Sequence, residues 1–315
     1  MISGVPLTSH PFNLDNLQKI RETSDEFPKP SLLSFDVFGT LYTPKEPVPV
    51  QYHKIASQEF GINKSVEDIT KEFPKIYAAL QREYPNYGKG TVEIASSDEW
   101  WSELIVRLFG IEHYKDNEIS AQLCTRLLDH FVGDEAYSVY DDVVPTLTTL
   151  KEHGIKMAVS SNSDGRVRQI LNNLGLSQFF ENENIYLSYD VGASKPQRSF
   201  YDSVACGFYE REFRRRLPLK LKGKFLENCW HVGDDYKKDF IGPIQAGWNG
   251  IFIDRDHSSE FFRQRRLPEK ESYPGCSVSQ PVQHKHNEKE MLLLANNRIV
   301  ITGLGQLLEI FKLEE

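Results

Sequence analysis

Several polar side chains of this 315-residue sequence lie at the ends of short apolar runs or within a few residues after them. They comprise one carboxylate, a hydroxyl beside an amide, an ammonium and two further carboxylates, namely Asp36, Ser161 with Asn162, Lys195, and Asp234 with Asp239. Carboxylate oxygens bind hard divalent cations such as Mg²⁺, and hydroxyl, amide and ammonium groups donate hydrogen bonds to phosphate oxygens. If the fold brings these side chains together, they suit a phosphate group held by a divalent cation.

Each of these residues fits one task in phosphoryl transfer. Asp36 can attack phosphorus as a nucleophile, which gives an aspartyl phosphate, and its other oxygen can bind Mg²⁺. Ser161 can donate a hydrogen bond to a phosphoryl oxygen, and Lys195 can hold the nucleophile and neutralise the charge that develops. Asp234 would complete the metal site, and Asp239 would orient a metal-bound water from behind it.

The apolar runs are predicted strands of a sheet, over residues 31–35, 155–160, 184–189, 228–233, 250–254 and 298–302. Amphipathic segments between them predict helices, three of which end on a glycine, at Gly154, Gly175 and Gly207. This alternation predicts an α/β fold with a doubly wound parallel sheet that has helices on both faces. The carboxyl ends of the strands of such a sheet meet in one cleft, so the polar residues should converge there.

Residues 45–139 interrupt the alternation, because they contain long amphipathic stretches and few strand signals. They predict a helical insert that leaves after the first strand, returns before the second and lies above the carboxyl ends of the strands. The predicted domains are a discontinuous core of 1–44 plus 140–315 and a helical cap of 45–139. Within the core, residues 256–290 are polar and aperiodic, so we expect a long surface loop.

Two adjacent tryptophans, Trp100 and Trp101, lie in the predicted insert. Neighbouring positions of a helix point about 100 degrees apart. We therefore expect one indole to pack inside the insert while the other faces the core or the cleft.

Composition limits the function classes. No apolar run reaches the ~18 residues of a membrane helix, and the N-terminus has no signal-peptide or clear transit-peptide pattern. We therefore expect no membrane contact and an intracellular protein, either cytoplasmic or mitochondrial. The four cysteines are far apart without metal-ligand spacing, which favours a reducing compartment. The net charge of −8 argues against nucleic acid as the main partner.

One basic stretch, residues 211–224, contains seven Lys and Arg residues and a single acid, Glu212. It could contact phosphate or an acidic protein partner. Because charge runs are usually solvated, a solvent-exposed helix end and loop is the favoured interpretation.

The polar groups resemble, in order and approximate spacing, the four motifs of the haloacid dehalogenase (HAD) superfamily. The matching segments are DVFGTL (36–41), VSSN (159–162), SKP (194–196) and GDDYKKD (233–239). The resemblance covers the chain from about residue 30, and residues 84–110 resemble the eukaryotic branch called haloacid dehalogenase-like hydrolase domain-containing protein 3. It implies a Rossmann-like core, a cap in the position of the insert, and a hydrolase that uses Mg²⁺ on a small phosphorylated substrate.

The resemblance also implies which residues form the site. Asp36 and Lys195 would be catalytic, and Thr40, Ser161 and Asn162 would bind phosphate. Mg²⁺ would be bound by Asp36, the backbone carbonyl of Phe38 and Asp234, with Asp239 behind them. Because Asp234 directly follows Gly233, we prefer it to Asp235 as the metal ligand.

Phe38 departs from the pattern, since phosphatases of this superfamily have a second Asp there, which protonates the leaving alkoxide and then activates water. A phenyl ring does neither, and such general acid-base help is typically worth ~10²–10⁴-fold. Dehalogenases of the superfamily also have aromatic residues there and attack carbon without a cation, but they usually lack the acids of the fourth motif. Three functions stay open: a slow Mg²⁺-dependent phosphoryl hydrolase, which we favour, a dehalogenase-like hydrolase, and a non-catalytic phosphate-binding or interaction protein.

Overall fold

The computed structural model describes residues 27, 29–259, 261, 291–295 and 297–313. Most of the predicted surface loop, 256–290, lies outside the described residues, as do residues 1–26 of the predicted core. Within the part of the chain that is described, no helix is long and apolar enough to cross a membrane.

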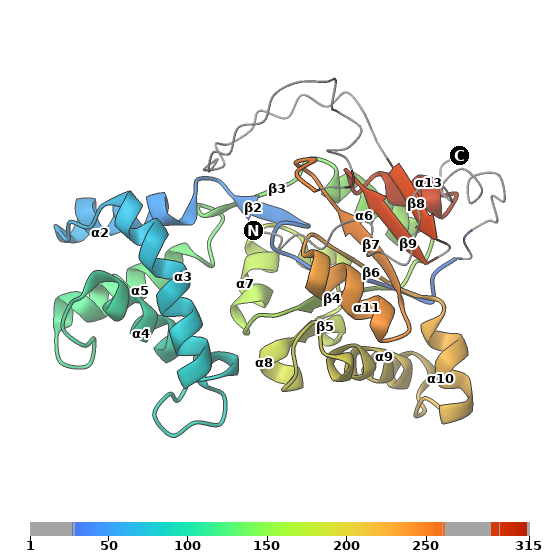
Figure 1. The fold of residues 1–315 in the computed structure, drawn as a ribbon, viewed down its shortest axis with the longest axis horizontal. Helices are drawn as coiled ribbons and strands as arrows, with labels where there is room; N and C mark the ends of the chain where they lie inside the picture. Colours follow the sequence, from blue (N-terminus) through green and yellow to red (C-terminus); the bar gives the residue numbers. More distant parts are fainter. Residues whose placement is uncertain (1–26, 28, 260, 262–290, 296, 314–315) are drawn as a thin grey trace.

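A seven-stranded sheet with the order β5–β4–β1–β6–β7–β9–β8 forms the centre of the protein (Figure 1). Its strands are β1 (Leu32–Phe35), β4 (Met157–Ser161), β5 (Ile185–Leu187), β6 (Cys229–Gly233), β7 (Asn249–Ile253), β8 (Met291–Ala295) and β9 (Arg298–Ile301). Neighbouring strands are parallel except β8, which runs antiparallel to β9. The α/β fold and the six predicted strands are confirmed, whereas the edge strand β8 was not predicted.

Helices cover both faces of the sheet because successive strand residues point to opposite sides. Leu33 and Phe35 of β1 pack in one apolar cluster with α6 (Val143–Glu152), α7 (Arg166–Asn173) and α13 (Gln306–Ile310). Leu32 packs on the other side with α9 (Arg198–Phe213) and α10 (Leu219–Leu226), and the short helix α11 (Gly242–Gln245) lies beside α9. Short 3-10 turns, η4 (Ser177–Phe179) and η5 (Asn182–Asn184), precede β5, and α8 (Ser188–Val191) follows it.

Helix α9 continues past Gly207, where the sequence predicted its end. It runs to Phe213 and is followed by Arg214 in the left-handed conformation, with φ of 53°. A Cβ atom at Gly207 would lie 3.2 Å from the ring of Tyr186 on β5. The glycine therefore allows the helix to pack closely on the sheet and does not terminate it.

The predicted helical insert is present and occupies the left side of Figure 1. It comprises α2 (Val48–Phe60), α3 (Val66–Glu83), η3 (Asn86–Gly88), α4 (Ser97–Phe109) and α5 (Glu118–His130). These helices enclose an apolar cluster of their own that includes Ile69, Leu104 and Leu127. Two short antiparallel strands, β2 (Tyr42–Pro44) and β3 (Tyr137–Val139), connect the insert to the core.

Candidate active site

The carboxyl ends of three neighbouring strands hold the predicted site residues. Asp36 follows β1, Ser161 ends β4 and Asp234 follows β6, and β1 lies between the other two strands. The amide of Asp36 donates to the carbonyl of Val232 on β6, at 2.8 Å, which fixes the position of Asp36 relative to the neighbouring strand. The parallel sheet thus brings these side chains to one edge, as the sequence predicted.

Lys195 connects two carboxylates of the site. Its ammonium donates to Oδ1 of Asp36 at 2.7 Å and to Oδ1 of Asp239 at 2.6 Å. Burial alone would lower the pKa of Lys195, but the attraction of Asp239 and Asp36 holds it above its usual range. Burial would likewise raise the pKa of Asp239, yet Lys195 and His231 hold it below its usual range. This pair therefore stays charged inside the protein.

Three carboxylates, those of Asp36, Asp234 and Asp239, offer oxygen atoms that all lie within 4.8 Å of one another. Loss of solvation raises the pKa of Asp36 to about 6, despite the opposing effect of Lys195. Asp234 as a whole residue is exposed to solvent, yet loss of solvation of its carboxyl group and repulsion by Asp36 and Asp239 raise the pKa of that group to about 8. A divalent cation would relieve this repulsion, and oxygen ligands are those that Mg²⁺ prefers.

Asp235 is not part of this carboxylate cluster. Its Oδ1 accepts hydrogen bonds from the amides of Lys237 and Lys238, at 3.0 and 2.8 Å, at the start of the helical segment η6 (Tyr236–Ile241). A carboxylate that caps a helix in this way is a structural feature. The geometry therefore agrees with the choice of Asp234 over Asp235, and the metal-ligand role of Asp234 stays a prediction.

Gly39 leaves room for Asp234. It has a left-handed φ of 78°, and a Cβ atom there would lie 2.2 Å from Oδ2 of Asp234. We expect Gly39→Ala to lower the affinity for Mg²⁺ by about 10–100-fold, because the displaced carboxylate can no longer reach the cluster. Isothermal titration of Mg²⁺ into the purified variant measures this.

The matched control for this change is Gly61→Ala. Gly61 ends α2 with a similar φ of 68°, but a Cβ atom there would meet nothing within 4 Å. Both variants carry comparable backbone strain, so only Gly39→Ala should weaken the binding of Mg²⁺. Equal affinities in the two variants would show that Asp234 is not a ligand.

The predicted phosphate-binding residues have different surroundings. Ser161 is buried, and its Oγ lies 2.9 Å from Oγ of Ser163. The Asn162 side chain donates to the carbonyl of Lys195 at 2.8 Å and accepts from its amide at 2.7 Å, so it holds the lysine loop in place. Thr40 is fully buried, and its Oγ1 has no hydrogen-bond partner among the described residues. Phosphate binding by these residues stays a prediction.

Phe38 is 47% exposed, which is unusual for a phenylalanine. Its ring makes edge contacts with Tyr42 and Tyr137, with ring centroids 6.1 and 6.3 Å apart. The side chain therefore has no essential place in the core. An aromatic residue that is two positions from Asp36 and open to solvent leaves this part of the site without an acid or a base.

Sequence reasoning missed a buried polar chain behind the site. Nε2 of His231 lies 3.0 Å from Oδ1 of Asp239, and Nδ1 lies 3.2 Å from Oγ of Ser34. Ser34 in turn donates to Oγ of Ser160 at 2.6 Å. Burial lowers the pKa of His231 and so favours the neutral ring, which helps to fix the orientation of Asp239. The sequence did contain a signal for this chain, because Ser34, Ser160 and His231 are polar residues inside otherwise apolar predicted strands.

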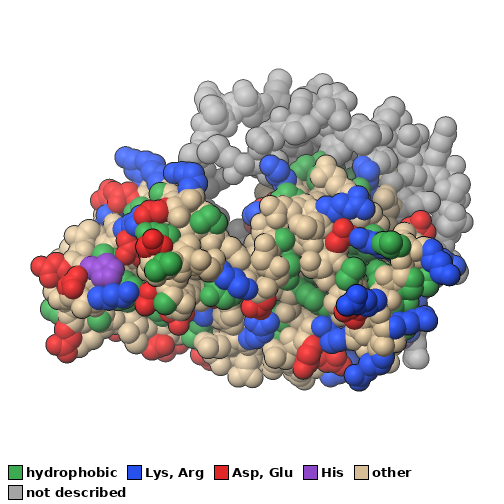
Figure 2. Space-filling view, turned by 90° about the horizontal axis from the view of Figure 1, so that it is seen from below, with side chains coloured by type: hydrophobic (Ala, Val, Ile, Leu, Met, Phe, Trp, Pro, Cys, Tyr) green, Lys and Arg blue, Asp and Glu red, His purple; other side chains and the backbone are tan. Residues whose placement is uncertain are grey.

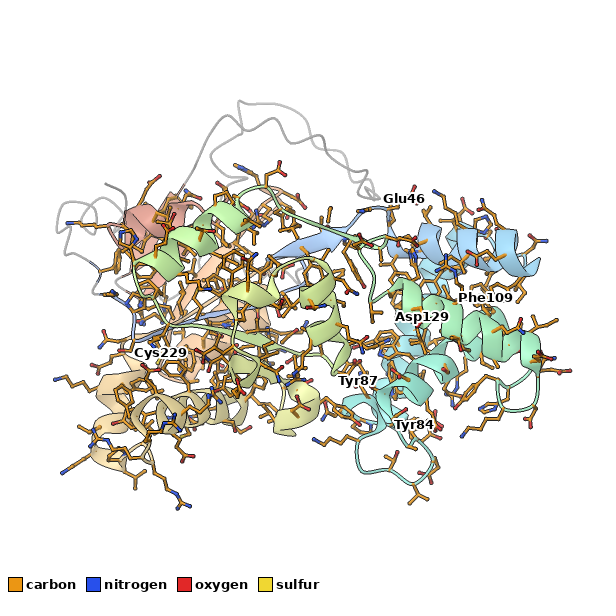
Figure 3. All side chains as sticks on the ribbon, turned by 180° about the vertical axis from the view of Figure 1, so that it is seen from behind. Glu46, Tyr84, Tyr87, Phe109, Asp129 and Cys229 are labelled. Atoms are coloured by element: carbon orange, nitrogen blue, oxygen red, sulfur yellow. The ribbon has the colours of Figure 1, made fainter. Side chains whose placement is uncertain are left out.

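It also missed the contacts that join the insert to the core. The indole of Trp101 donates to Oδ2 of Asp164 at 2.9 Å, and the guanidinium of Arg166 lies over its ring at 4.5 Å. Trp100, in contrast, is fully buried inside the insert, so the prediction for the two indoles is confirmed. Tyr87, on the side of the insert that faces the core (Figure 3), donates to the carbonyl of Asn162 at 2.9 Å.

The basic stretch 211–224 forms the end of α9, a loop and most of α10, and Lys and Arg side chains gather over this part of the core in Figure 2. Lys222 pairs with Asp202, whereas Arg214, Arg215 and Arg216 are exposed. The stretch is thus largely solvent-exposed, as favoured from the sequence, but residues 219–224 belong to helix α10, where a loop was expected. Its contact with an acidic protein partner stays a prediction.

Comparisons with known proteins agree with the motifs. A protein-family model described as a haloacid dehalogenase-like hydrolase matches residues 30–247. An uncharacterized protein of Saccharomyces cerevisiae is 29% identical over 293 residues, which are 90% of this chain and 93% of the yeast protein. Haloacid dehalogenase-like hydrolase domain-containing protein 3 of Mus musculus is 27% identical over 248 residues, 78% of this chain and 90% of the mouse protein.

The fold is also similar to that of a solved Bacillus subtilis protein, described as a HAD-hydrolase bound to magnesium. The TM-score is 0.50 and the sequence identity is 20%, over 74% of this chain and 91% of the bacterial chain. The resemblance predicted from the four motifs is therefore confirmed by sequence and by fold.

Proposed function

Because this chain belongs to the haloacid dehalogenase-like hydrolase family, we propose that it is a Mg²⁺-dependent hydrolase that transfers a phosphoryl group from a small phosphorylated substrate to Asp36. The observation that carries this proposal is the contact of Lys195 with Asp36 and Asp239 beside the carboxylate of Asp234. A buried ammonium beside a cluster of acids suits a dianionic phosphate bound with a divalent cation.

The residues divide the reaction between them. Lys195 holds one oxygen of Asp36, and the other oxygen attacks phosphorus while the bond from phosphorus to the leaving-group oxygen breaks. Attack of water on the phosphorus of the aspartyl phosphate then releases phosphate and restores Asp36. Mg²⁺, held by Asp36, the Phe38 carbonyl and Asp234, would neutralise charge on the phosphoryl oxygens. Ser161, Asn162 and Thr40 would bind those oxygens.

Phe38 makes this reaction slow on ordinary esters. The leaving oxygen departs without a proton donor, and the attacking water has no base at this position. An aryl phosphate avoids the first difficulty, because its leaving group is stable as an anion. We therefore propose activated phosphates as the best substrates.

The two alternatives differ in what they require of the site. Attack on carbon, as in a dehalogenase, needs no cation. Without a cation, holding three mutually repelling carboxylates together would cost free energy and would not help the reaction. A non-catalytic scaffold would bind phosphate and Mg²⁺ without turnover, and the exposed Phe38 is the feature that favours it. The acidic cluster supports phosphoryl chemistry over the first alternative.

A comparison of three substrates tests the proposal. With Mg²⁺ present, we expect 4-nitrophenyl phosphate to be hydrolysed at least ~10²-fold faster than glycerol 3-phosphate, and 2-chloropropionate to release no chloride. Chloride release would support the dehalogenase function. If Mg²⁺ binds and none of the three reacts, the protein is a non-catalytic scaffold.

We further propose that residues 45–139 act as a cap domain on the discontinuous core of 1–44 and 140–315. Support comes from the separate apolar cluster of the insert and from the contacts of Trp101 and Tyr87 with the core. We also propose an intracellular location, either cytoplasmic or mitochondrial. The three described cysteines, Cys124, Cys206 and Cys229, are free thiols, which is what a reducing compartment favours.

A further inference from the structure

The side chain of Arg255 connects segments of the core that are far apart in the sequence. Arg255 lies two positions after β7, and its side chain is only 9% exposed. Its Nη2 donates to the backbone carbonyl of Thr40 at 2.7 Å. Its Nη1 donates to both carboxylate oxygens of Asp142, at 3.0 and 3.1 Å. A charged group that donates to two partners in this way fixes the position of each relative to the other.

The contact with Thr40 reaches the segment that begins with the proposed nucleophile, residues 36–41. Thr40 is fully buried, and among the described residues Arg255 is the one donor to its carbonyl. A buried carbonyl that loses its donor has neither water nor protein to replace it, which costs free energy. The position of the segment 36–41 therefore depends on Arg255.

The contact with Asp142 reaches the segment through which the chain returns from the insert, between β3 and α6 (Figure 1). In this segment the ring of Tyr140 lies under the guanidinium of Arg255, at 3.8 Å from its central carbon. Oδ2 of Asp142 also accepts from the amide of Leu304, at 2.5 Å. Arg255 is thus held from three sides, and it joins the return segment to the segment 36–41.

These contacts need a guanidinium. Its planar fork donates in two directions while its face lies on an aromatic ring. A lysine has the same charge, but its single nitrogen cannot contact the Thr40 carbonyl and both oxygens of Asp142 with the same geometry. Arg255→Lys therefore separates the effect of the contacts from the effect of the charge.

We infer that Arg255 is a positioning residue for the proposed phosphoryl transfer. It holds the segment 36–41 against the return segment of the insert, and so sets where Asp36 and Thr40 lie relative to a bound phosphate. In the described part of the chain, Arg255 forms no hydrogen bond with the four charged residues of the candidate site, so it acts through Thr40. The inference rests on the proposed function, which assigns the phosphate to this segment.

Binding of inorganic phosphate, the product of the proposed reaction, tests the inference. With Mg²⁺ present, isothermal titration of phosphate into Arg255→Lys should give a dissociation constant at least about tenfold above that of the unaltered protein. An unchanged constant would overturn the inference, as would an unaltered protein that binds no phosphate. The thermal midpoint of unfolding is measured beside it, because a merely structural role would lower the midpoint and leave the affinity of the folded protein unchanged.

Arg168→Lys is the matched control. Nη2 of Arg168 donates to the backbone carbonyl of Ile185 at 3.2 Å and to Oδ2 of Asp190 at 2.8 Å. Arg168 thus also joins a carbonyl to a carboxylate, but neither partner belongs to the segment 36–41. We expect Arg168→Lys to keep the affinity of the unaltered protein for phosphate. Equal losses of affinity in the two variants would contradict the assignment to Arg255.

Asp142→Asn tests the same contacts by a milder change, since it keeps the shape of the side chain and weakens its hold on Arg255. It should raise the dissociation constant for phosphate by at least about threefold. If the two residues act as one unit, the double variant with Arg255→Lys should have the constant of Arg255→Lys alone. Effects that multiply in the double variant would show that Asp142 does not act through Arg255.

These titrations measure binding and need no turnover. Loss of the proposed function would appear as hydrolysis that does not depend on Asp36, whatever the affinity of the variants for phosphate. Failure of the inference would appear as an unchanged affinity in Arg255→Lys, while hydrolysis still depends on Asp36. The two results are therefore distinguishable.

Discussion

Asp36→Asn should reduce hydrolysis of an aryl phosphate by about 10³-fold or more, since an amide is a poor nucleophile and the proposed reaction begins with attack by this carboxylate. Asparagine has the size of aspartate, and Lys195 keeps its contact with Asp239. We therefore expect the fold to survive. Measurement of kcat/KM together with the thermal midpoint of unfolding separates loss of chemistry from loss of structure.

The control for this variant is Asp235→Asn. Asp235 lies one position from Asp234, but its carboxylate caps η6 and is not part of the acidic cluster. We expect this variant to keep most of the activity at a somewhat lower stability. If Asp36→Asn retained the activity of the unaltered protein, Asp36 would not be the nucleophile.

Phe38→Asp should raise the hydrolysis of an alkyl phosphate by ~10²–10⁴-fold, which is the usual value of general acid-base help. The new carboxyl group would stand where the leaving oxygen needs a proton and the attacking water needs a base. Because Phe38 is half exposed and makes only edge contacts with Tyr42 and Tyr137, the substitution should cost little stability. Rates for glycerol 3-phosphate measure the effect.

Phe38→Asn is the matched control, since it has the shape of aspartate but no titratable proton. A gain in Phe38→Asp that Phe38→Asn does not share would assign the effect to acid-base chemistry. The gain should be smaller for 4-nitrophenyl phosphate, whose leaving group needs little protonation. Equal rates in the two variants would mean that position 38 does not face the reacting bond.

Phe38 argues against fast hydrolysis of phosphate esters, whereas the cluster of Asp36, Asp234 and Asp239 argues for phosphoryl chemistry. One physical interpretation fits both observations. In the proposed reaction, Asp36, Asp234, Asp239 and Lys195 would bind a phosphate with its cation and form an aspartyl phosphate without any help from the side chain at position 38. Two proton transfers lack a residue that could perform them. They are protonation of the leaving group and removal of a proton from the attacking water. Under this proposal, the site contains the residues for the attack and lacks those that make departure and release fast.

The sequence predicted the placement of the site because strand ends can be identified locally. Asp36, Ser161 and Asp234 each follow or end an apolar run, and a parallel sheet brings such positions to one edge. The choice between Asp234 and Asp235 rested on one residue of spacing. The structure adds a physical reason, because Oδ1 of Asp235 accepts from two backbone amides of η6 and Oδ2 accepts from the ammonium of Lys238.

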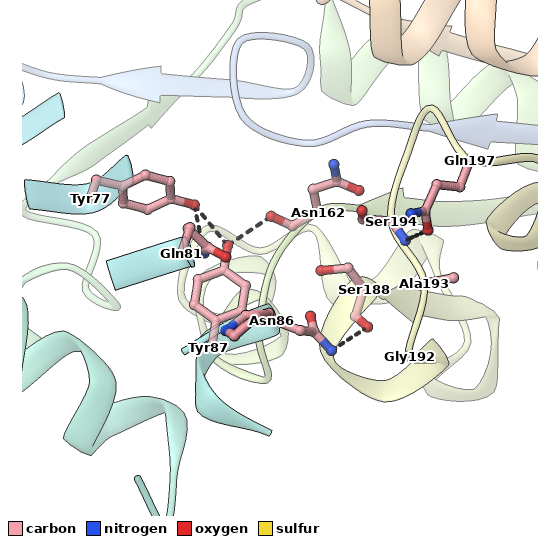
Figure 4. A pocket seen from close by; sticks show the side chains of 11 residues that line it. Tyr77, Gln81, Asn86, Tyr87, Asn162, Ser188, Gly192, Ala193, Ser194 and Gln197 are labelled. Atoms are coloured by element: carbon pink, nitrogen blue, oxygen red, sulfur yellow. Dashed lines mark hydrogen bonds between the residues drawn. The ribbon is translucent and has the colours of Figure 1, made fainter. Parts of the chain in front are cut away.

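Contacts between distant segments could not be predicted in this way. The pair of Trp101 and Asp164 joins residues 63 positions apart, and nothing in either local pattern specifies the other. Gly207 shows a related difficulty, since its role depends on the ring of Tyr186 on a separate strand. A pocket of about 350 Å³ between the insert and the core (Figure 4), which is lined by Gln81 from the insert and Gln197 from the core, depends on the same long-range packing.

The most direct test of the central claim is hydrolysis of 4-nitrophenyl phosphate by the unaltered protein and by Asp36→Asn, each with Mg²⁺ and with EDTA. Of these four samples, we expect turnover only in the unaltered protein with Mg²⁺, because the reaction needs both the carboxylate and the cation. Turnover that persists in EDTA or in Asp36→Asn would contradict the proposed phosphoryl transfer to Asp36.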